Sequence, residues 1–266
     1  MSEAKVIAIA NQKGGVAKST TTVNLGAGFR RLGKKVLVID ADPQGSLTVS
    51  LGIKNPDGLE NSLSTLVQSI MEDESFDKDN VLIHHEEGID LIPSNIELSG
   101  IEISLFNTMS RELVLKNCIE HFKSNYDYIL VDCMPSLGLM TINALAAADS
   151  VIVPCQPHFL STKGLNLLLR SISRVKKQIN PALTIDGILL TIVNSRTNNA
   201  KAISTSLRES VGGGIRVFDT EIPHSVRIPE SSIAGKSIFS YDKNCKAATA
   251  YEAFSKEVAG LERKQN

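Results

Sequence analysis

The sequence predicts an α/β fold: a doubly wound, mostly parallel β-sheet with helices on both faces, forming one domain over residues 1–266. Short strands that are apolar at nearly every position alternate with helical segments along the chain. Such continuous apolar runs are typical of parallel sheets that are covered on both faces. The chain is 42% apolar and 21% charged, which supplies a sizeable core and excludes wholesale disorder.

The expected elements follow one another as strand and helix. Runs of apolar residues predict strands over 6–10, 36–40, 90–93, 128–132, 150–154 and 187–193, with an edge strand over 217–222. Helical periodicity predicts helices over 20–32, 111–123, 141–148, 163–179, 201–210 and 247–261. The acidic, Ser-rich segment 55–87 fits either a helical excursion or a loop. Ligands of such sheets bind beyond the carboxyl ends of the strands, so we expect functional residues directly after them.

Several classes of protein are excluded by the composition. The chain has no run of about 18 apolar residues, so no transmembrane helix is expected. Its first residues do not form a basic region followed by an apolar stretch, as a secretory signal would. The cysteines are far apart and form no CxxC pair, which argues against a disulfide framework or a zinc site and fits the cytoplasm: Cys118, Cys133, Cys155 and Cys245.

The net charge of −1 hides an uneven distribution. Residues 160–246 contain 13 Lys and Arg against 6 Asp and Glu, a balance of +7, and the rest of the chain has a balance of −8. The acidic excess is concentrated in residues 54–97, with 11 acidic and 2 basic residues. Taken alone, this asymmetry fits an ordinary solvated surface as well as a nucleic-acid partner.

A glycine-containing loop follows the first strand and precedes a helix. It reads Asn-Gln-Lys-Gly-Gly-Val-Ala-Lys-Ser-Thr over residues 11–20. Glycines allow backbone N–H groups to turn around an anion, and the helix N-terminus adds its positive dipole end. Lys18 can reach the β- and γ-phosphates of a nucleotide, and the Ser19 hydroxyl can ligate Mg²⁺. The alternative is an ordinary glycine-rich turn between strand and helix.

Carboxylates follow two further strands. Asp40 and Asp42 end the second strand, two residues apart, so one can hold a Mg²⁺-bound water while the other orients the attacking water. The alternative is a helix cap or an Asx turn before Pro43. Asp132 follows four apolar residues, a pattern in which the carboxylate supports the Mg²⁺ shell. The adjacent Cys133 fits a buried packing residue better than a redox residue.

These motifs resemble those of the ParA/MinD family of deviant-Walker ATPases, which are P-loop NTPases. The loop matches the pattern KGGxGK[ST], except that Ala17 stands where the family usually has glycine. The segment after Asp132 resembles the family's DCPPSLG, with Met134 in place of one proline. The resemblance continues through Gly187–Thr191, Ser195–Asn198, Ile222–Pro223 and Val226–Glu230 and covers nearly the whole chain. It is nearest to the short partition ATPases of the Soj type.

The resemblance implies a Mg²⁺-dependent ATPase whose cofactors are ATP and Mg²⁺. Two ATP-bound chains would form a sandwich homodimer. The implied catalytic residues are Lys13, which reaches the partner's nucleotide, Lys18, and Asp42, which activates water. The implied nucleotide-binding residues are Lys13, Gly14, Gly15, Val16, Ala17, Lys18, Ser19 and Thr20, with Asn194 and Pro223 near the adenine. The implied metal ligands are Ser19, Asp40 and Asp132.

The resemblance also implies partners. The dimer would bind double-stranded DNA nonspecifically in the cytoplasm, on the nucleoid, and a ParB-like centromere-binding protein would stimulate hydrolysis. The basic segment 160–246 would contact the phosphates. Arg196 and Arg227 match DNA-contacting positions of the family, and Lys201 and Lys236 are expected neighbours.

Two relatives of the same superfamily remain as alternatives. A membrane-positioning ATPase of the MinD type needs an amphipathic, lipid-binding C-terminal helix. Here the apolar residues of the last helix form one narrow stripe and the opposite face mixes both charges, so we expect this helix to dock on the core and expect no membrane partner. A metallocluster-assembly or metabolic ATPase is the other alternative, and the scattered cysteines do not favour a shared cluster.

Overall fold

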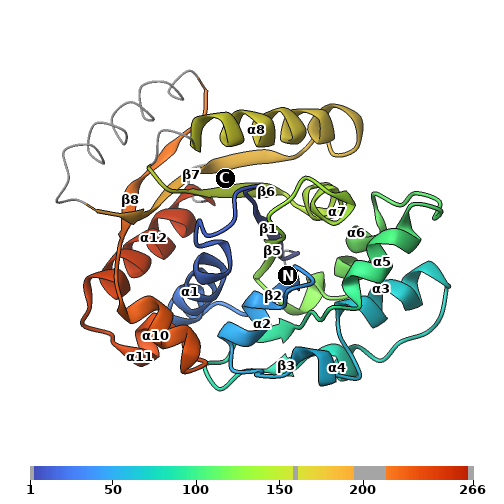
Figure 1. Ribbon diagram of the computed structural model, residues 1–266, viewed down its shortest axis with the longest axis horizontal. Helices are drawn as coiled ribbons and strands as arrows, with labels where there is room; N and C mark the ends of the chain where they lie inside the picture. Colours follow the sequence, from blue (N-terminus) through green and yellow to red (C-terminus); the bar gives the residue numbers. More distant parts are fainter. Residues whose placement is uncertain (1–2, 158–160, 195–213, 263–266) are drawn as a thin grey trace.

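The computed structural model describes residues 3–157, 161–194 and 214–262. Within these ranges, eight strands form one sheet in the order β3-β4-β2-β5-β1-β6-β7-β8. All neighbouring strands are parallel except β3, which is antiparallel to β4. The predicted fold class, a doubly wound and mostly parallel sheet, is therefore confirmed (Figure 1).

Every predicted strand is present. The strands are β1 Lys5–Ile9, β2 Val36–Ala41, β3 Ile83–His84, β4 Asp90–Ile92, β5 Tyr128–Cys133, β6 Ser150–Cys155, β7 Thr184–Val193 and β8 Val217–Pro223. The strand expected at an edge is β8, which pairs only with β7 among the described residues. The strand that was not predicted is β3, because two residues are too few to show a hydrophobic pattern.

The helices agree less closely with prediction. They are α1 Lys18–Arg31, α2 Ser46–Ser50, α3 Leu63–Met71, α4 Lys78–Val81, α5 Leu98–Leu105, α6 Val114–Glu120, α7 Leu139–Ala147, α8 Ser161–Gln178, α10 Arg227–Ile233, α11 Ile238–Tyr241 and α12 Lys246–Glu262, with 3-10 turns Pro56–Gly58 and Lys123–Asn125. The helix predicted over 111–123 is shorter, because Ser110 has φ of 51° and Leu113 closes a turn onto it. The helix predicted over 201–210 lies outside the described residues.

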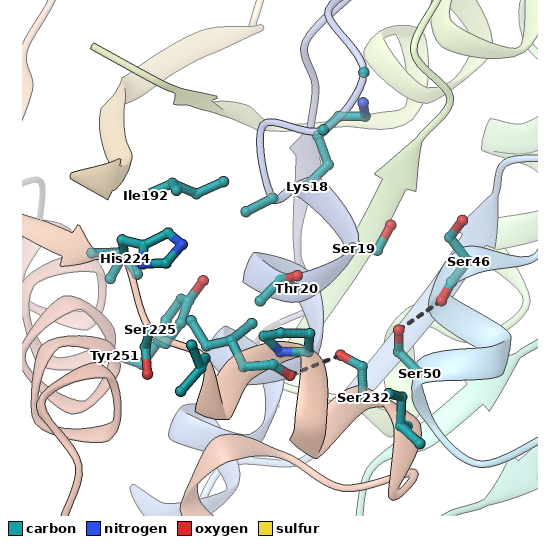
Figure 2. A pocket seen from close by; sticks show the side chains of 18 of the residues that line it. Lys18, Ser19, Thr20, Ser46, Ser50, Ile192, His224, Ser225, Ser232 and Tyr251 are labelled. Atoms are coloured by element: carbon teal, nitrogen blue, oxygen red, sulfur yellow. Dashed lines mark hydrogen bonds between the residues drawn. The ribbon is translucent and has the colours of Figure 1, made fainter. Parts of the chain in front are cut away.

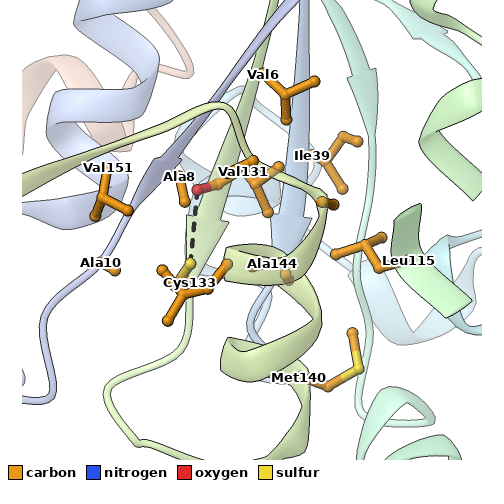
Figure 3. Close-up of a cluster of buried hydrophobic side chains, with 14 of the residues drawn as sticks. Val6, Ala8, Ala10, Ile39, Leu115, Val131, Cys133, Met140, Ala144 and Val151 are labelled. Atoms are coloured by element: carbon orange, nitrogen blue, oxygen red, sulfur yellow. Dashed lines mark hydrogen bonds between the residues drawn. The ribbon is translucent and has the colours of Figure 1, made fainter. Parts of the chain in front are cut away.

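The two faces of the sheet carry separate cores. Successive side chains of a strand point to opposite faces. Ile7 and Ile9 of β1 therefore join the side chains of α1 and α12, whereas Val6 and Ala8 face the helices on the other side. Figure 1 shows α1, α10, α11 and α12 on one side and α3, α5, α6, α7 and α8 on the other. Figure 3 shows the second core, where Val131 and Cys133 of β5 lie beside Ala144 of α7.

The last helix, α12, docks on the core as predicted. Its apolar stripe is completely buried at Ala247, Tyr251, Phe254 and Val258. Phe254 packs edge-to-face on Phe218 of β8, with ring centroids 5.0 Å apart. None of the described helices is long and apolar enough to cross a membrane. The apolar face of α12 is thus already occupied by the protein itself.

We expect Phe254→Ala to lower the free energy of unfolding by about 3 to 5 kcal/mol, because it leaves a cavity between α12 and β8. Chemical denaturation monitored by circular dichroism would measure this loss. Lys256→Ala on the exposed face of the same helix is the control. It removes only an i,i+4 pair with Glu252, so its effect should stay within about 0.5 kcal/mol. Equal stability of the two variants would contradict the docking of α12.

Candidate functional site

The loop between β1 and α1 presents an open backbone. Gly15 has φ of 70°, Ala17 has φ of 65°, and α1 begins at the next residue, Lys18. A Cβ added at Gly14 or Gly15 would meet nothing within 4 Å among the described atoms, so an anion has access to the main chain. The left-handed conformation of Ala17 costs roughly 1 to 2 kcal/mol relative to glycine. This is the strain that the departure from glycine at position 17 introduces.

Side chains far away in the sequence hold the loop in place. The Asn11 amide donates to the Pro154 carbonyl at 2.7 Å, and the Gln12 amide donates to the Gly164 carbonyl at 2.9 Å. On the other side, Gln156 donates to the carbonyl of Gly15 at 3.1 Å. The loop is therefore fixed by β6 and α8 before any ligand arrives, which lowers the ordering cost of binding.

A cavity of about 780 Å³ opens over this loop (Figure 2). Many predicted site residues line it together: Gly14, Gly15, Ala17, Lys18, Ser19, Thr20, Asp42 and Pro223. Figure 2 shows Ile192 and His224 on one side of the cavity and Ser46 and Ser50 of α2 on the other. The volume lies in the range of small-molecule sites, so a nucleotide-sized ligand fits.

Several lining residues were missed by the sequence prediction. They come from α2, β7, β8, α10, α12 and the segment between β8 and α10: Ser46, Ser50, Ile192, Ile222, His224, Ser225, Val226, Ile228, Pro229, Ser232, Ile233 and Tyr251. A usable signal existed for His224 and Ser225, which directly follow the carboxyl end of β8. Ile192 has φ of 54°, which is strained for a β-branched residue, and such outliers gather at binding sites.

Five predicted site residues do not belong to the described lining: Lys13, Val16, Asp40, Asp132 and Asn194. The Val16 side chain is buried, and its carbonyl accepts a hydrogen bond from Thr191 at 3.0 Å. Lys13 is half-buried, and its carbonyl accepts the ammonium of Lys18 at 3.4 Å. Asn194 is exposed just after β7. A role of these residues toward a ligand remains a prediction.

The carboxylates of Asp40 and Asp132 lie side by side beneath the cavity, because the parallel register pairs these two residues of β2 and β5. Asp40 is fully buried, and its Oδ2 accepts from the Thr48 N–H at 2.8 Å and from the Thr48 hydroxyl at 2.7 Å. Its Oδ1 accepts from the Asp42 N–H at 3.2 Å. Burial raises the pKa of Asp40 to about 6, against these hydrogen bonds. Asp40 thus anchors the segment from Asp42 to α2.

Asp132 is the less satisfied member of the pair. Its Oδ2 is buried without a hydrogen-bond partner in the described part of the chain, and its Oδ1 accepts a long 3.5 Å hydrogen bond from the Thr22 hydroxyl. Burial and then the charge of Asp40 raise the pKa of Asp132, while the Ser19 hydroxyl and the Lys18 ammonium act in the opposite direction. An orphaned buried oxygen of this kind fits a ligand that brings a cation or water.

Lys18 and Asp42 are the other charged residues close to Asp40 and Asp132, and both line the cavity. Lys18 is 7% exposed, and burial lowers the pKa of its ammonium while Asp132 opposes that shift. Asp42 faces the cavity, and its Oδ1 also accepts from the Gln44 N–H at 3.0 Å, so it forms the Asx turn before Pro43 as well. No cluster of three or more His, Cys, Asp or Glu side chains suited to a metal occurs in the described residues.

Only two of the four residues predicted to contact DNA, Arg227 and Lys236, belong to the residues that the structure describes. Arg196 and Lys201 lie outside the described residues. Arg227 begins α10 and pairs with Glu230 at 2.9 Å and Asp242 at 3.4 Å. Lys236 follows α10, 3.9 Å from Glu86. Both side chains are about half exposed, at 51% and 46%.

A close contact joins this region to the cavity. Gly52 ends the turn after α2 with φ of 92°, and Gly235 ends the turn after α10 with φ of 68°. A Cβ on Gly235 would lie 2.6 Å from the Gly52 Cα, so the two backbones touch directly. The helix that follows Asp42 is therefore packed against the helix that Arg227 begins.

Comparisons with known proteins agree with this geometry. Residues 4–185 match the family model described as an AAA domain. The chain is 44% identical over 255 residues to the sporulation initiation inhibitor protein Soj of Bacillus subtilis (strain 168), covering 96% of this chain and 98% of that protein. The chain belongs to the ParA/Soj family of partition ATPases. It is also 40% identical to the chromosome partitioning protein ParA of Caulobacter vibrioides (strain NA1000 / CB15N), over 97% of this chain and 95% of that protein.

The fold of the family is also that of a solved structure with bound nucleotide. The cobyrinic acid a,c-diamide synthase of Mycobacterium smegmatis, solved with ADP and magnesium, superposes with a TM-score of 0.85 at 34% identity. The match covers 99% of this chain and 97% of that one. The identification of the chain as a ParA/Soj-type ATPase from its motifs is thus confirmed.

We expect Asp40→Asn to change how stability depends on pH. The pKa of Asp40 is raised from 3.8 to about 6 in the folded state, so folding favours the protonated carboxyl group. The contribution of Asp40 to the free energy of unfolding is therefore fully present below pH 3.8 and is lost as the pH rises through 6. Two pKa units correspond to about 3 kcal/mol at most. The stability of Asp40→Asn relative to the parent should therefore increase between pH 4 and 7, an effect that relief of Asp132 reinforces.

Urea unfolding of both proteins at a series of pH values would measure this difference. The Asn side chain cannot accept equally from Thr48 and Asp42, so its stability is expected to be lower than the parent's at pH 4. Parallel stability curves for the two proteins would show that Asp40 has no raised pKa.

Proposed function

We propose that this chain uses ATP and Mg²⁺ to drive partition of a chromosome or plasmid, as an ATP-bound homodimer that binds DNA without sequence preference. The observation that carries the proposal is the meeting of the open loop, Lys18, Ser19 and Asp42 around one cavity. The chain is more similar to partition proteins, at 44% and 40% identity, than to the diamide synthase at 34%. This order favours partition over a metabolic ATPase.

The geometry supports the following division of labour for hydrolysis. The backbone of Gly14 to Ser19 and the N-terminus of α1 would surround the phosphates, and Lys18 would neutralise them. Ser19, and Asp132 through water, would hold Mg²⁺, which when bound offsets phosphate charge. Asp42 is the carboxylate that faces the cavity and would orient the attacking water. Asp40, with its oxygens bound to Thr48 and Asp42, would position Asp42.

Lys13 has a different environment from Lys18. It has no ion-pair partner among the described residues, and it lies on the same loop as Lys18. Two ammonium groups on one loop repel each other, so a separate anion for Lys13 is favourable. The phosphates of a partner's nucleotide would supply it, and a cation there stabilises charge that develops in phosphoryl transfer.

We expect Lys13→Ala to bind ATP as a monomer and to lose ATP-dependent dimerisation and hydrolysis, the latter by at least about a hundredfold. Lys18→Ala should weaken nucleotide binding itself, because Lys18 serves its own site. Fluorescent nucleotide titration, light scattering and phosphate release would separate the two effects. A Lys13→Ala protein that forms a stable dimer and hydrolyses ATP normally would remove Lys13 from the partner's site.

The DNA part of the proposal rests on charge. The balance of +7 over residues 160–246 includes Arg227 and Lys236, which are half exposed, and Arg196 and Lys201. A dimer doubles this surface, and affinity for phosphates rises steeply with the number of contacts. The backbone contact of Gly52 with Gly235 joins the turn after α2 to the turn after α10, so a displacement of α2 at the nucleotide site would be transmitted to α10. A ParB-like protein would then stimulate hydrolysis and release the chain from the nucleoid.

DNA binding measured with ATP and with ADP tests this proposal. We expect affinity with ATP to exceed that with ADP by at least about tenfold at moderate salt, because only the dimer presents enough cations. Arg227→Ala should weaken binding to all sequences alike and flatten the dependence on salt, with dimerisation unchanged. Lys256→Ala, which removes an exposed cation from α12, is the matched control. Equal affinity with both nucleotides would refute the switch.

A further inference from the structure

Exposed apolar side chains lie on α5 and in the turns that precede and follow it. Its members are Ile103, Phe106 and Met109, which are 71%, 60% and 92% exposed, together with Ile96 at 51%. We call these four residues the α5 patch. Large side chains scattered singly over a surface need no explanation, but Ile103 and Phe106 are three residues apart at the end of α5 and so lie on one face, which indicates a contact surface.

The α5 patch belongs to the edge of the sheet that carries the nucleotide cavity. Glu102 on α5 accepts a hydrogen bond through Oε1 from the Met140 N–H at 3.3 Å, in the first turn of α7. That helix follows the carboxyl end of β5, and Pro135 of the intervening segment lines the cavity. Helix α5 therefore packs against α7, the helix that follows the segment containing Asp132 and Pro135.

Charged side chains of both signs border the α5 patch. The Arg111 guanidinium lies 5.9 Å from the centroid of the Phe106 ring and donates to the Phe106 carbonyl at 3.1 Å. Arg111 also pairs with Glu112 at 3.0 Å. An apolar centre beside charges of both signs suits a surface of the same composition, as in an interface between identical chains. A strongly basic or acidic partner would not be matched by this rim.

We propose that the α5 patch is buried against a second copy of this chain when two nucleotide-bearing edges face each other. The inference rests on the proposed ATP-bound dimer and adds a contact outside the loop of Lys13. In a two-fold dimer the contact occurs twice, so one substitution removes two apolar contacts. The patch thereby contributes affinity without touching the nucleotide.

The double variant Phe106→Ser/Met109→Ser tests this inference. We expect its dimer with a non-hydrolysable ATP analogue to be at least about tenfold weaker than that of the parent, by light scattering or sedimentation. Its affinity for a fluorescent ATP analogue as a monomer should stay within twofold. Leu167→Ser, at a 43% exposed position on α8, is the matched control and should dimerise like the parent. Phe106→Leu should also retain the dimer, because it keeps an apolar side chain.

The outcomes separate the inference from the proposed function. A parent chain that binds ATP and stays monomeric refutes both. A parent that dimerises together with a double variant that dimerises equally well refutes only the role of the α5 patch. Normal dimerisation of the double variant with loss of stimulation by a ParB-like protein would also refute it, and would assign the patch to that partner.

Discussion

Two carboxyl groups and one ammonium group are buried together at the carboxyl ends of β2 and β5. The register of the sheet places Asp40 directly opposite Asp132, and Lys18 reaches them from the start of α1. Like charges side by side in a buried sheet are unfavourable unless a cation or a proton is present. Burial is the main reason that the pKa of each carboxyl group is raised, and a neighbouring carboxylate adds to the shift: Asp42 acts on Asp40, and Asp40 acts on Asp132. Backbone N–H groups of Asp42 and Thr48 donate hydrogen bonds to Asp40 at this place.

The hydrogen bonds around this group show how the chain manages the burial of charge. Asp40 satisfies its oxygens with Thr48 and Asp42 and so fixes the beginning of α2. Asp132 keeps one oxygen without a described partner. The two carboxyl groups in adjacent strands therefore differ in their contacts: the oxygens of Asp40 are bound by the protein, and one oxygen of Asp132 is not bound by any described residue. The strain at Ala17 and Ile192 lies around the same cavity, where a ligand can compensate for it.

Much of the fold could be predicted because buried parallel strands leave long apolar runs in the sequence, and the loop of Lys18 follows one of them directly. The short helices α2, α10 and α11 could not be predicted, since four to seven residues span at most two helical turns and are too few to establish a periodic pattern. The lining of the cavity was predicted best where it comes from one continuous segment, as for Gly14, Gly15 and Ala17 to Thr20. It was predicted less well where it depends on packing: Ile192, Ser232 and Tyr251 come from distant elements. The position of Asp40 beneath the cavity likewise depends on its contacts with Thr48.

The glycine pair after α2 and α10 has a consequence for how the protein can change during evolution. Side chains usually absorb small displacements between packed elements by changing rotamer, but Gly52 and Gly235 have none. If either turn moved toward the other, the two main chains would clash directly, because no side chain lies between them. Position 235 is closed to every other residue in this geometry, both by its φ of 68° and by the Gly52 Cα. The contact between the turn after α2 and the turn after α10 thus consists of main chain, and mutation at neighbouring side chains can modify it only indirectly.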